Sequence, residues 1–69
     1  MLTVDARGLS CPEPALIAKR TLEKAASGSV NVLVDEMAAC ENVTALAKSM
    51  GWQVTSKSTS TGIELNLRR

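Results

Sequence analysis

Histidine, phenylalanine and tyrosine are absent from this sequence, and Trp52 is its only aromatic residue. Without histidine the commonest general base near neutral pH is missing, which excludes Ser-His and Cys-His pairs and His-ligated metal sites within the chain. The aromatic side chains on which single-stranded nucleic acids stack are missing as well. The sequence therefore predicts a protein without a self-contained acid–base active site.

Strong charge of one sign and long apolar runs are also lacking. Eight Lys and Arg stand against seven Asp and Glu, a net charge of +1, and the charges are spread along the chain. A nucleic-acid binder would need a basic stripe, so no direct nucleic-acid partner is expected. No run approaches the ~20 apolar residues of a membrane span. We expect no membrane association, a cytoplasmic location and one domain over residues 1–69.

Cysteine is scarce, with only Cys11 and Cys40, and no Cys-x-x-Cys spacing occurs. Two cysteines without histidine cannot complete a closed zinc site in one chain. In the reducing cytoplasm both thiols are expected to be free. The acidic residues match no oxygen-ligand loop for a cation, so neither a metal nor another cofactor is expected.

Apolar periodicity predicts six elements in the order β-α-β-α-β-β. Strands are expected at residues 2–6, 30–34, 52–58 and 63–67, with helices over 11–25 and between the turn at 35–37 and Gly51. Gly28 is expected to end the first helix, and Asp35 to cap the second.

The predicted fold is α+β, a two-layer sandwich with both helices on one face of a four-stranded mixed sheet. The first two strands should be parallel with a right-handed crossover, and the last two an antiparallel hairpin. Because parallel strands end at the same edge, the two helices should start side by side. Cys11 and Cys40 are therefore expected near one rim of the sheet.

The Cys11-Pro12-Glu13-Pro14 segment is the most informative part of the chain. Prolines are tolerated only in the first turn of a helix, which places Cys11 at the N-cap and Pro12 at the first helical position. The positive end of the helix should lower the pKa of the Cys11 thiol. We expect Arg7 to assist this effect and Glu13 to oppose it.

Other interpretations exist for both cysteines and for Trp52. Cys11 is interpreted as a reactive thiol that Gly8 leaves approachable, with a small buried apolar residue as the alternative. Cys40 lies at the edge of an apolar helical stripe and is interpreted as structural, with a resolving thiol for Cys11 as the alternative. Trp52 is interpreted as a packing residue rather than a docking anchor.

The segment from Val4 to Pro14, VDARGLSCPEP, resembles the signature of the TusA/SirA family of small sulfur-carrier proteins, Asp-x-x-Gly-Leu-x-Cys-Pro-x-Pro. This resemblance implies a βαβαββ sandwich in which Cys11 accepts sulfane sulfur as a persulfide and passes it to a partner. Its partners would be sulfur-donor and sulfur-acceptor proteins. Residues 41–43 and 51–52 are similar to the YedF-like branch, which is associated with selenium or sulfur metabolism. The family signature gives Cys40 no role.

Two functions follow. The first is a sulfur carrier or sulfurtransferase, with Cys11 as the sulfur-bearing residue, and the second is a non-catalytic redox-sensing or regulatory interaction module. RNA binding on the open sheet face is disfavoured by charge and by the lack of aromatics. The residues expected to support Cys11 belong to the motif around it: Asp5, Arg7, Gly8, Leu9, Pro12, Glu13 and Pro14.

Overall fold

The computed structural model describes residues 2–9, 13–25 and 27–69. Its elements follow the predicted order. They are β1 (Leu2–Asp5), α1 (Glu13–Ala25), β2 (Ser29–Val34), α2 (Met37–Ser49), β3 (Gln53–Thr59) and β4 (Gly62–Arg68).

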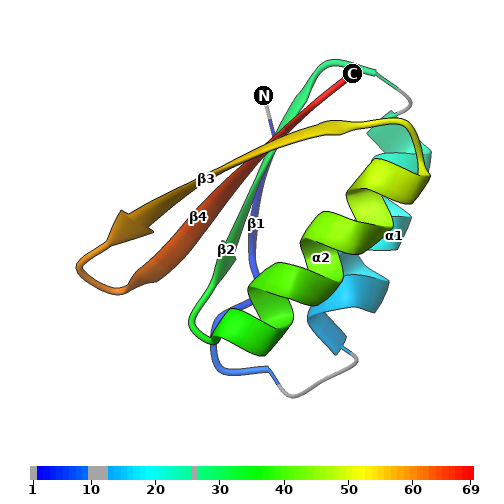
Figure 1. The fold of residues 1–69 in the computed structure, drawn as a ribbon. Helices are drawn as coiled ribbons and strands as arrows, with labels where there is room; N and C mark the ends of the chain where they lie inside the picture. Colours follow the sequence, from blue (N-terminus) through cyan, green and yellow to red (C-terminus); the bar gives the residue numbers. More distant parts are fainter. Residues whose placement is uncertain (1, 10–12, 26) are drawn as a thin grey trace.

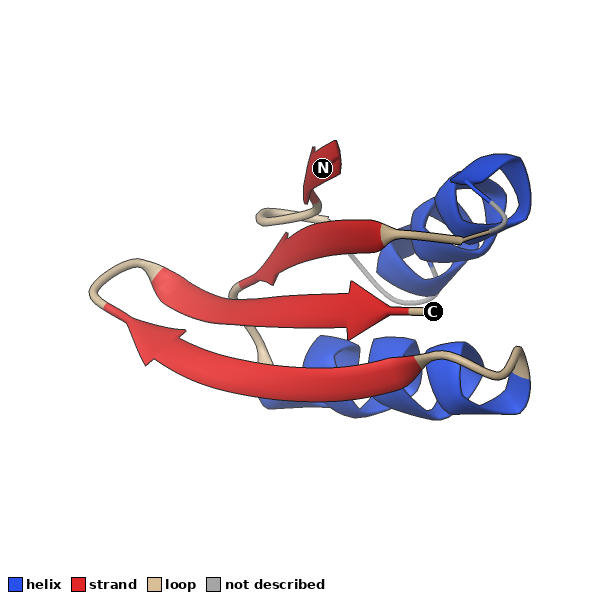
Figure 2. Ribbon diagram, turned by 90° about the horizontal axis from the view of Figure 1, so that it is seen from above, coloured by secondary structure: helices blue, strands red, loops and turns tan. Residues whose placement is uncertain are grey.

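Both helices cover one face of the sheet, and no helix of the described residues lies on the other face (Figures 1 and 2). The strand order is β1-β2-β4-β3. Strands β1 and β2 are parallel, and β4 pairs antiparallel with both β2 and β3. The predicted two-layer α+β fold is thus confirmed, including the parallel pair and the closing hairpin. The hairpin folds back so that its second strand, β4, lies in the centre of the sheet.

The core lies between the sheet and the two helices. Alternate residues of β2 point inward, so Val30, Val32 and Val34 are fully buried beside Leu65 and Leu67 of β4. Each such side chain contributes roughly 1.5–3 kcal/mol when it leaves water. The helices complete the core with small and branched side chains at helical spacing: Ala18, Leu22, Ala39, Val43 and Ala47.

The end of α2 carries Trp52 into this core. Met50 is the C-cap, and Gly51 follows with a positive φ of 86°. The Gly51 amide donates to the Lys48 carbonyl, and the Trp52 amide donates to the Ala47 carbonyl, which is the Schellman pattern. Trp52 is only 3% exposed, so its interpretation as a packing residue is confirmed.

Gly28 has a different role from the helix-ending one that was expected. Helix α1 ends at Ala25 among the described residues, and Gly28 exchanges two backbone hydrogen bonds of 3.0 Å with Arg69. These bonds extend the β2–β4 ladder by one residue pair. Gly28 therefore belongs to the start of the sheet.

Candidate functional site

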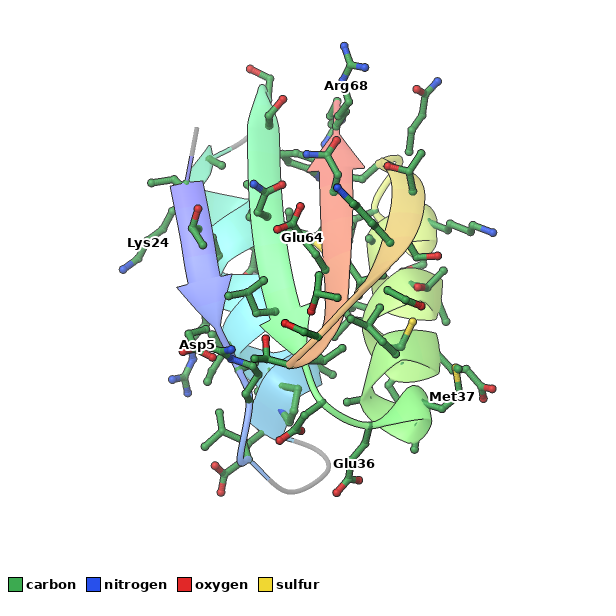
Figure 3. All side chains as sticks on the ribbon, turned by 90° about the vertical axis from the view of Figure 1, so that its left-hand side faces the viewer. Asp5, Lys24, Glu36, Met37, Glu64 and Arg68 are labelled. Atoms are coloured by element: carbon green, nitrogen blue, oxygen red, sulfur yellow. The ribbon has the colours of Figure 1, made fainter. Side chains whose placement is uncertain are left out.

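Three chain connections meet at one end of the sheet. Because β1 and β2 are parallel and β4 runs antiparallel to them, the segment after β1, the turn after β2 and the β3–β4 turn share this end. Figure 3 shows Asp5, Glu36 and Met37 toward this end and Arg68 at the opposite end. We call it the helix-start rim, because α1 and α2 both begin here (Figure 1).

Asp5 and Arg7 form a bidentate ion pair at this rim. The Arg7 Nε and one terminal nitrogen donate to the two Asp5 carboxylate oxygens, each at 2.9 Å, and the Arg7 backbone amide also donates to Asp5 at 3.1 Å. The other terminal nitrogen of Arg7 donates to the Thr61 hydroxyl at 3.0 Å. Arg7 therefore ties the segment after β1 to the β3–β4 turn.

The same contacts shift the pKa values of both Asp5 and Arg7. Hydrogen bonds from the Arg7 side chain and backbone lower the pKa of Asp5 from 3.8 to about 2. The carboxylate of Asp5 in turn raises the pKa of Arg7, and the charge of Asp35 adds to this effect. At neutral pH the pair is therefore fully ionised, and Asp5 already balances the Arg7 charge.

Asp35 does not cap α2, contrary to the sequence prediction. The N-cap residue is Glu36, whose side chain makes no capping hydrogen bond. The Asp35 carboxylate instead accepts a 2.9 Å hydrogen bond from the Gly8 amide. Asp35 therefore binds the amide of Gly8, 27 residues away, and not an amide at the start of α2. The two residues come close because each follows one strand of the parallel pair.

The motif residues on either side of Gly8 are held as well. Ala6 is buried, and its amide donates to the Leu33 carbonyl at 2.8 Å. Leu9 is partly buried against the core. Gly8 itself has a φ of 78°, a left-handed conformation that glycine adopts readily. Residues 6 to 9 are thus fixed by contacts with other parts of the fold.

The start of α1 carries the remaining motif residues. Glu13 is exposed in the first turn, and Pro14 is buried on the inner side of the helix. The predictions for Cys11 and Pro12, namely the N-cap thiol and the first helical proline, lie outside the described residues. Both roles therefore stay predictions from the sequence.

Cys40 lies one turn into α2, near the same rim, and is partly buried against the core. This position agrees with the structural interpretation of Cys40. Its thiol is free in the structure. A resolving role toward Cys11 stays a prediction.

Two exposed apolar side chains and a shallow hollow lie near the helix starts. Leu16 of α1 is 48% exposed, and Met37 of α2 is 63% exposed. Leu16 lines an open hollow of about 290 Å³ together with Glu13, Ile17 and Arg20. A larger hollow, about 500 Å³, lies at the opposite end of the sheet between Gly28 and Arg69 and contains no motif residue.

Metal-binding clusters and membrane-spanning helices are both absent from the described ranges. No group of three His, Cys, Asp or Glu side chains in residues 2–9, 13–25 and 27–69 is arranged to hold a metal ion. Within the same ranges neither helix has the length and apolar character needed to cross a membrane.

Sequence reasoning gave Asp35 a different role, that of a helix cap, and did not single out Thr61. A signal existed for Asp35, because polar residues that follow parallel strands meet at one sheet edge. No comparable signal existed for Thr61, since its position depends on β4 lying next to β2.

Fold and rim together define a small two-layer α+β protein whose helix α1 begins at Glu13, within the Cys-Pro-Glu-Pro stretch of the sequence. The family model "Sulfurtransferase TusA" matches residues 2–68. This chain belongs to that family.

Two similar proteins agree with the family. A protein of Archaeoglobus fulgidus named "Putative sulfur carrier protein" is 34% identical over 55 residues, which cover 78% of this chain and 71% of that protein. The crystal structure of the SirA-like protein from Desulfitobacterium hafniense superposes with a TM-score of 0.91 at 37% identity. The superposed region covers 99% of this chain and 96% of the SirA-like chain.

Proposed function

We propose that this protein carries sulfane sulfur as a persulfide on Cys11, receiving it from a donor protein and delivering it to an acceptor protein. The observation that carries the proposal is the family match over residues 2–68, which contains the Cys-Pro-Glu-Pro segment. The chain has no histidine to act as a base. A relay needs only a nucleophilic sulfur, because its partners supply the other catalytic groups.

The transfer step is a nucleophilic displacement at sulfur. The Cys11 thiolate attacks the terminal sulfur of the donor persulfide, the donor S–S bond breaks, and the donor cysteine leaves as a thiolate. Cys11 then holds the new S–S bond as Cys11-S-SH. In the delivery step, a nucleophile of the acceptor attacks the terminal sulfur of Cys11-S-SH, the S–S bond breaks, and Cys11 leaves as a thiolate. No external oxidant or reductant is consumed in either step. Such exchange is fastest when the attacking thiol has a pKa near ambient pH.

The supporting residues act before and after Cys11 in the chain. Asp5, Arg7, Gly8 and Leu9 fix the segment that leads into the cysteine. Pro12, Glu13 and Pro14 follow it at the start of the helix, where the prolines restrict the backbone. We place the protein in the cytoplasm, and its pathway on the YedF-like side of the family.

Intact-mass analysis tests the proposal. The purified chain is mixed with a cysteine desulfurase and cysteine, and the expected product is heavier by the mass of one sulfur atom. A reductant should remove the added mass. Cys11→Ser should abolish loading, whereas Cys40→Ser, the matched control in the same chain, should load like the wild type.

Three results would contradict the proposal: no adduct on the wild type, an equal adduct on Cys11→Ser, or loss of loading in Cys40→Ser alone. A Cys11–Cys40 disulfide under mild oxidant, without any sulfur loading, would instead favour the redox-sensing alternative.

A further inference from the structure

The segment that leads into Cys11 is held at three consecutive residues by three different parts of the fold. Arg7 donates to Asp5 and to Thr61, the Gly8 amide donates to Asp35, and Leu9 packs on the core. We call the polar part of this arrangement the loop-anchoring network: Asp5, Arg7, Gly8, Asp35 and Thr61.

Within the described part of the chain, the Gly8 amide is held by a residue from another part of the fold, because it donates to the Asp35 carboxylate. Before Gly8, the Arg7 amide donates locally to Asp5, and the Ala6 amide donates to Leu33 at the end of the β1–β2 ladder. Gly8 lies beyond that ladder with a φ of 78°, and a Cβ built on it would meet no atom within 4 Å. The Asp35 hydrogen bond therefore holds Gly8 directly at its amide, while the next residue, Leu9, packs on the core.

The position of Asp35 is itself constrained by the hairpin. Gly62 lies so close to the β2–α2 turn that a Cβ there would overlap the Val34 carbonyl oxygen and come within 3.2 Å of the Asp35 Cα. The β3–β4 turn therefore packs directly on the backbone that carries Asp35. Through Thr61 the same turn also accepts the hydrogen bond from Arg7.

We propose that Asp35 is a positioning residue of the sulfur carrier, which fixes the approach to Cys11 by holding the Gly8 amide. This inference rests on the proposed function of Cys11. The sequence predicts the Cys11 thiol at the positive end of α1, where the thiolate is favoured, and a loosened Gly8 should weaken that placement. Asp35 would thus control both the ionisation and the presentation of the sulfur through Gly8.

The experiment compares Asp35→Ala, Asp35→Asn and Glu36→Ala with the wild type. Asparagine retains a side-chain oxygen that can accept from the Gly8 amide, whereas alanine has none. Glu36 is the matched control, because it is the next residue, carries the same charge, is exposed and makes no side-chain capping bond. Asp35 is exposed as well, so its loss removes no buried surface and the variants should fold.

Two measurements need no sulfur donor. Amide exchange at Gly8, followed by NMR, should be about tenfold faster in Asp35→Ala, because the anchoring bond is gone. Alkylation of Cys11 by iodoacetamide at fixed pH, measured in a Cys40→Ser background, should be about tenfold slower. Asp35→Asn should restore both to within about threefold of the wild type, and Glu36→Ala should change neither.

Sulfur loading from the desulfurase should fall in parallel with alkylation. An unchanged Gly8 exchange rate, an unchanged alkylation rate in Asp35→Ala, or an equal effect of Glu36→Ala would overturn the role of Asp35. If the alkylation series behaves as expected but the wild type accepts no sulfur, the proposed function fails while the positioning of the thiol by Asp35 is supported.

Discussion

Asp5 and Arg7 are separated by a single buried residue, Ala6, yet their side chains meet in a bidentate ion pair at 2.9 Å. The ion pair holds Arg7, in the segment that follows β1, against the last residue of that strand. It also occupies the carboxylate of Asp5 on both oxygens. This geometry has consequences for acid stability and for the electrostatics around Cys11.

Acid should weaken the fold through Asp5. The pKa of Asp5 is about 2 in the folded chain, against 3.8 for a free side chain. A lowered folded pKa contributes stability above pH 3.8, and this contribution disappears as the pH falls through 3.8 toward 2. Asp5→Asn should therefore unfold at lower urea than the wild type at pH 6. The two urea midpoints should converge near pH 2, and a gap independent of pH would contradict the assignment.

The role of Arg7 can be separated from a direct effect on sulfur by a double variant. Arg7→Gln alone leaves the Asp5 charge unbalanced and should raise the apparent pKa of Cys11, measured as the midpoint of its alkylation rate against pH. Asp5→Asn with Arg7→Gln removes a neutral pair, so the midpoint should return to within about half a unit of the wild type. A midpoint that stays raised in the double variant would show that Arg7 acts on the sulfur directly.

Gly62 should be the glycine least tolerant of substitution. Gly62→Ala would force a Cβ against the Val34 carbonyl at a φ of 148°, and we expect a loss of about 2 kcal/mol or more. Gly28→Ala is the control, because its φ of 106° is also positive but no atom lies within 4 Å of the added carbon. Its cost should be about 1 kcal/mol. Equal unfolding free energies for the two variants would show that the Val34 contact is relieved without cost.

Trp52 buries an indole N–H that has no hydrogen-bond partner among the residues the structure describes. Such a group costs about 1–3 kcal/mol, which offsets much of the packing that the larger ring provides. Trp52→Phe should therefore change the unfolding free energy by less than about 1.5 kcal/mol, whereas Trp52→Ala should cost about 3–5 kcal/mol. Circular dichroism must monitor unfolding, because Trp52 is the only tryptophan. An equal loss of unfolding free energy in Trp52→Phe and Trp52→Ala would contradict the cost assigned to the unpaired indole N–H.

The fold could be predicted from the sequence because local patterns determine most of it. Alternation in residues 30–34 and helical spacing of Ala18 and Leu22 identify the buried faces, and the β-α-β order requires a parallel pair. The central place of β4 could not be predicted, since β4 pairs on both sides and no local pattern chooses its second neighbour.

The candidate site was predictable only where its chemistry is local. The Cys-Pro-Glu-Pro segment reveals a helix start from sequence alone. Asp35 was assigned to the wrong partner, because an aspartate just before a helix resembles a cap, while its true donor, Gly8, is brought close only by the parallel pairing. Thr61 depends on a turn whose neighbours follow from the position of β4.

Leu2 pairs with Val30, and Val30 pairs with Leu67, so the start of β1 and the end of β4 lie at the end of the sheet opposite the helix-start rim. Affinity handles, fluorophores or fusion partners attached at either extremity would therefore project away from the side of the molecule that carries the helix-start rim. The protein can be immobilised on a bead or sensor chip by either extremity while that side still faces incoming partners.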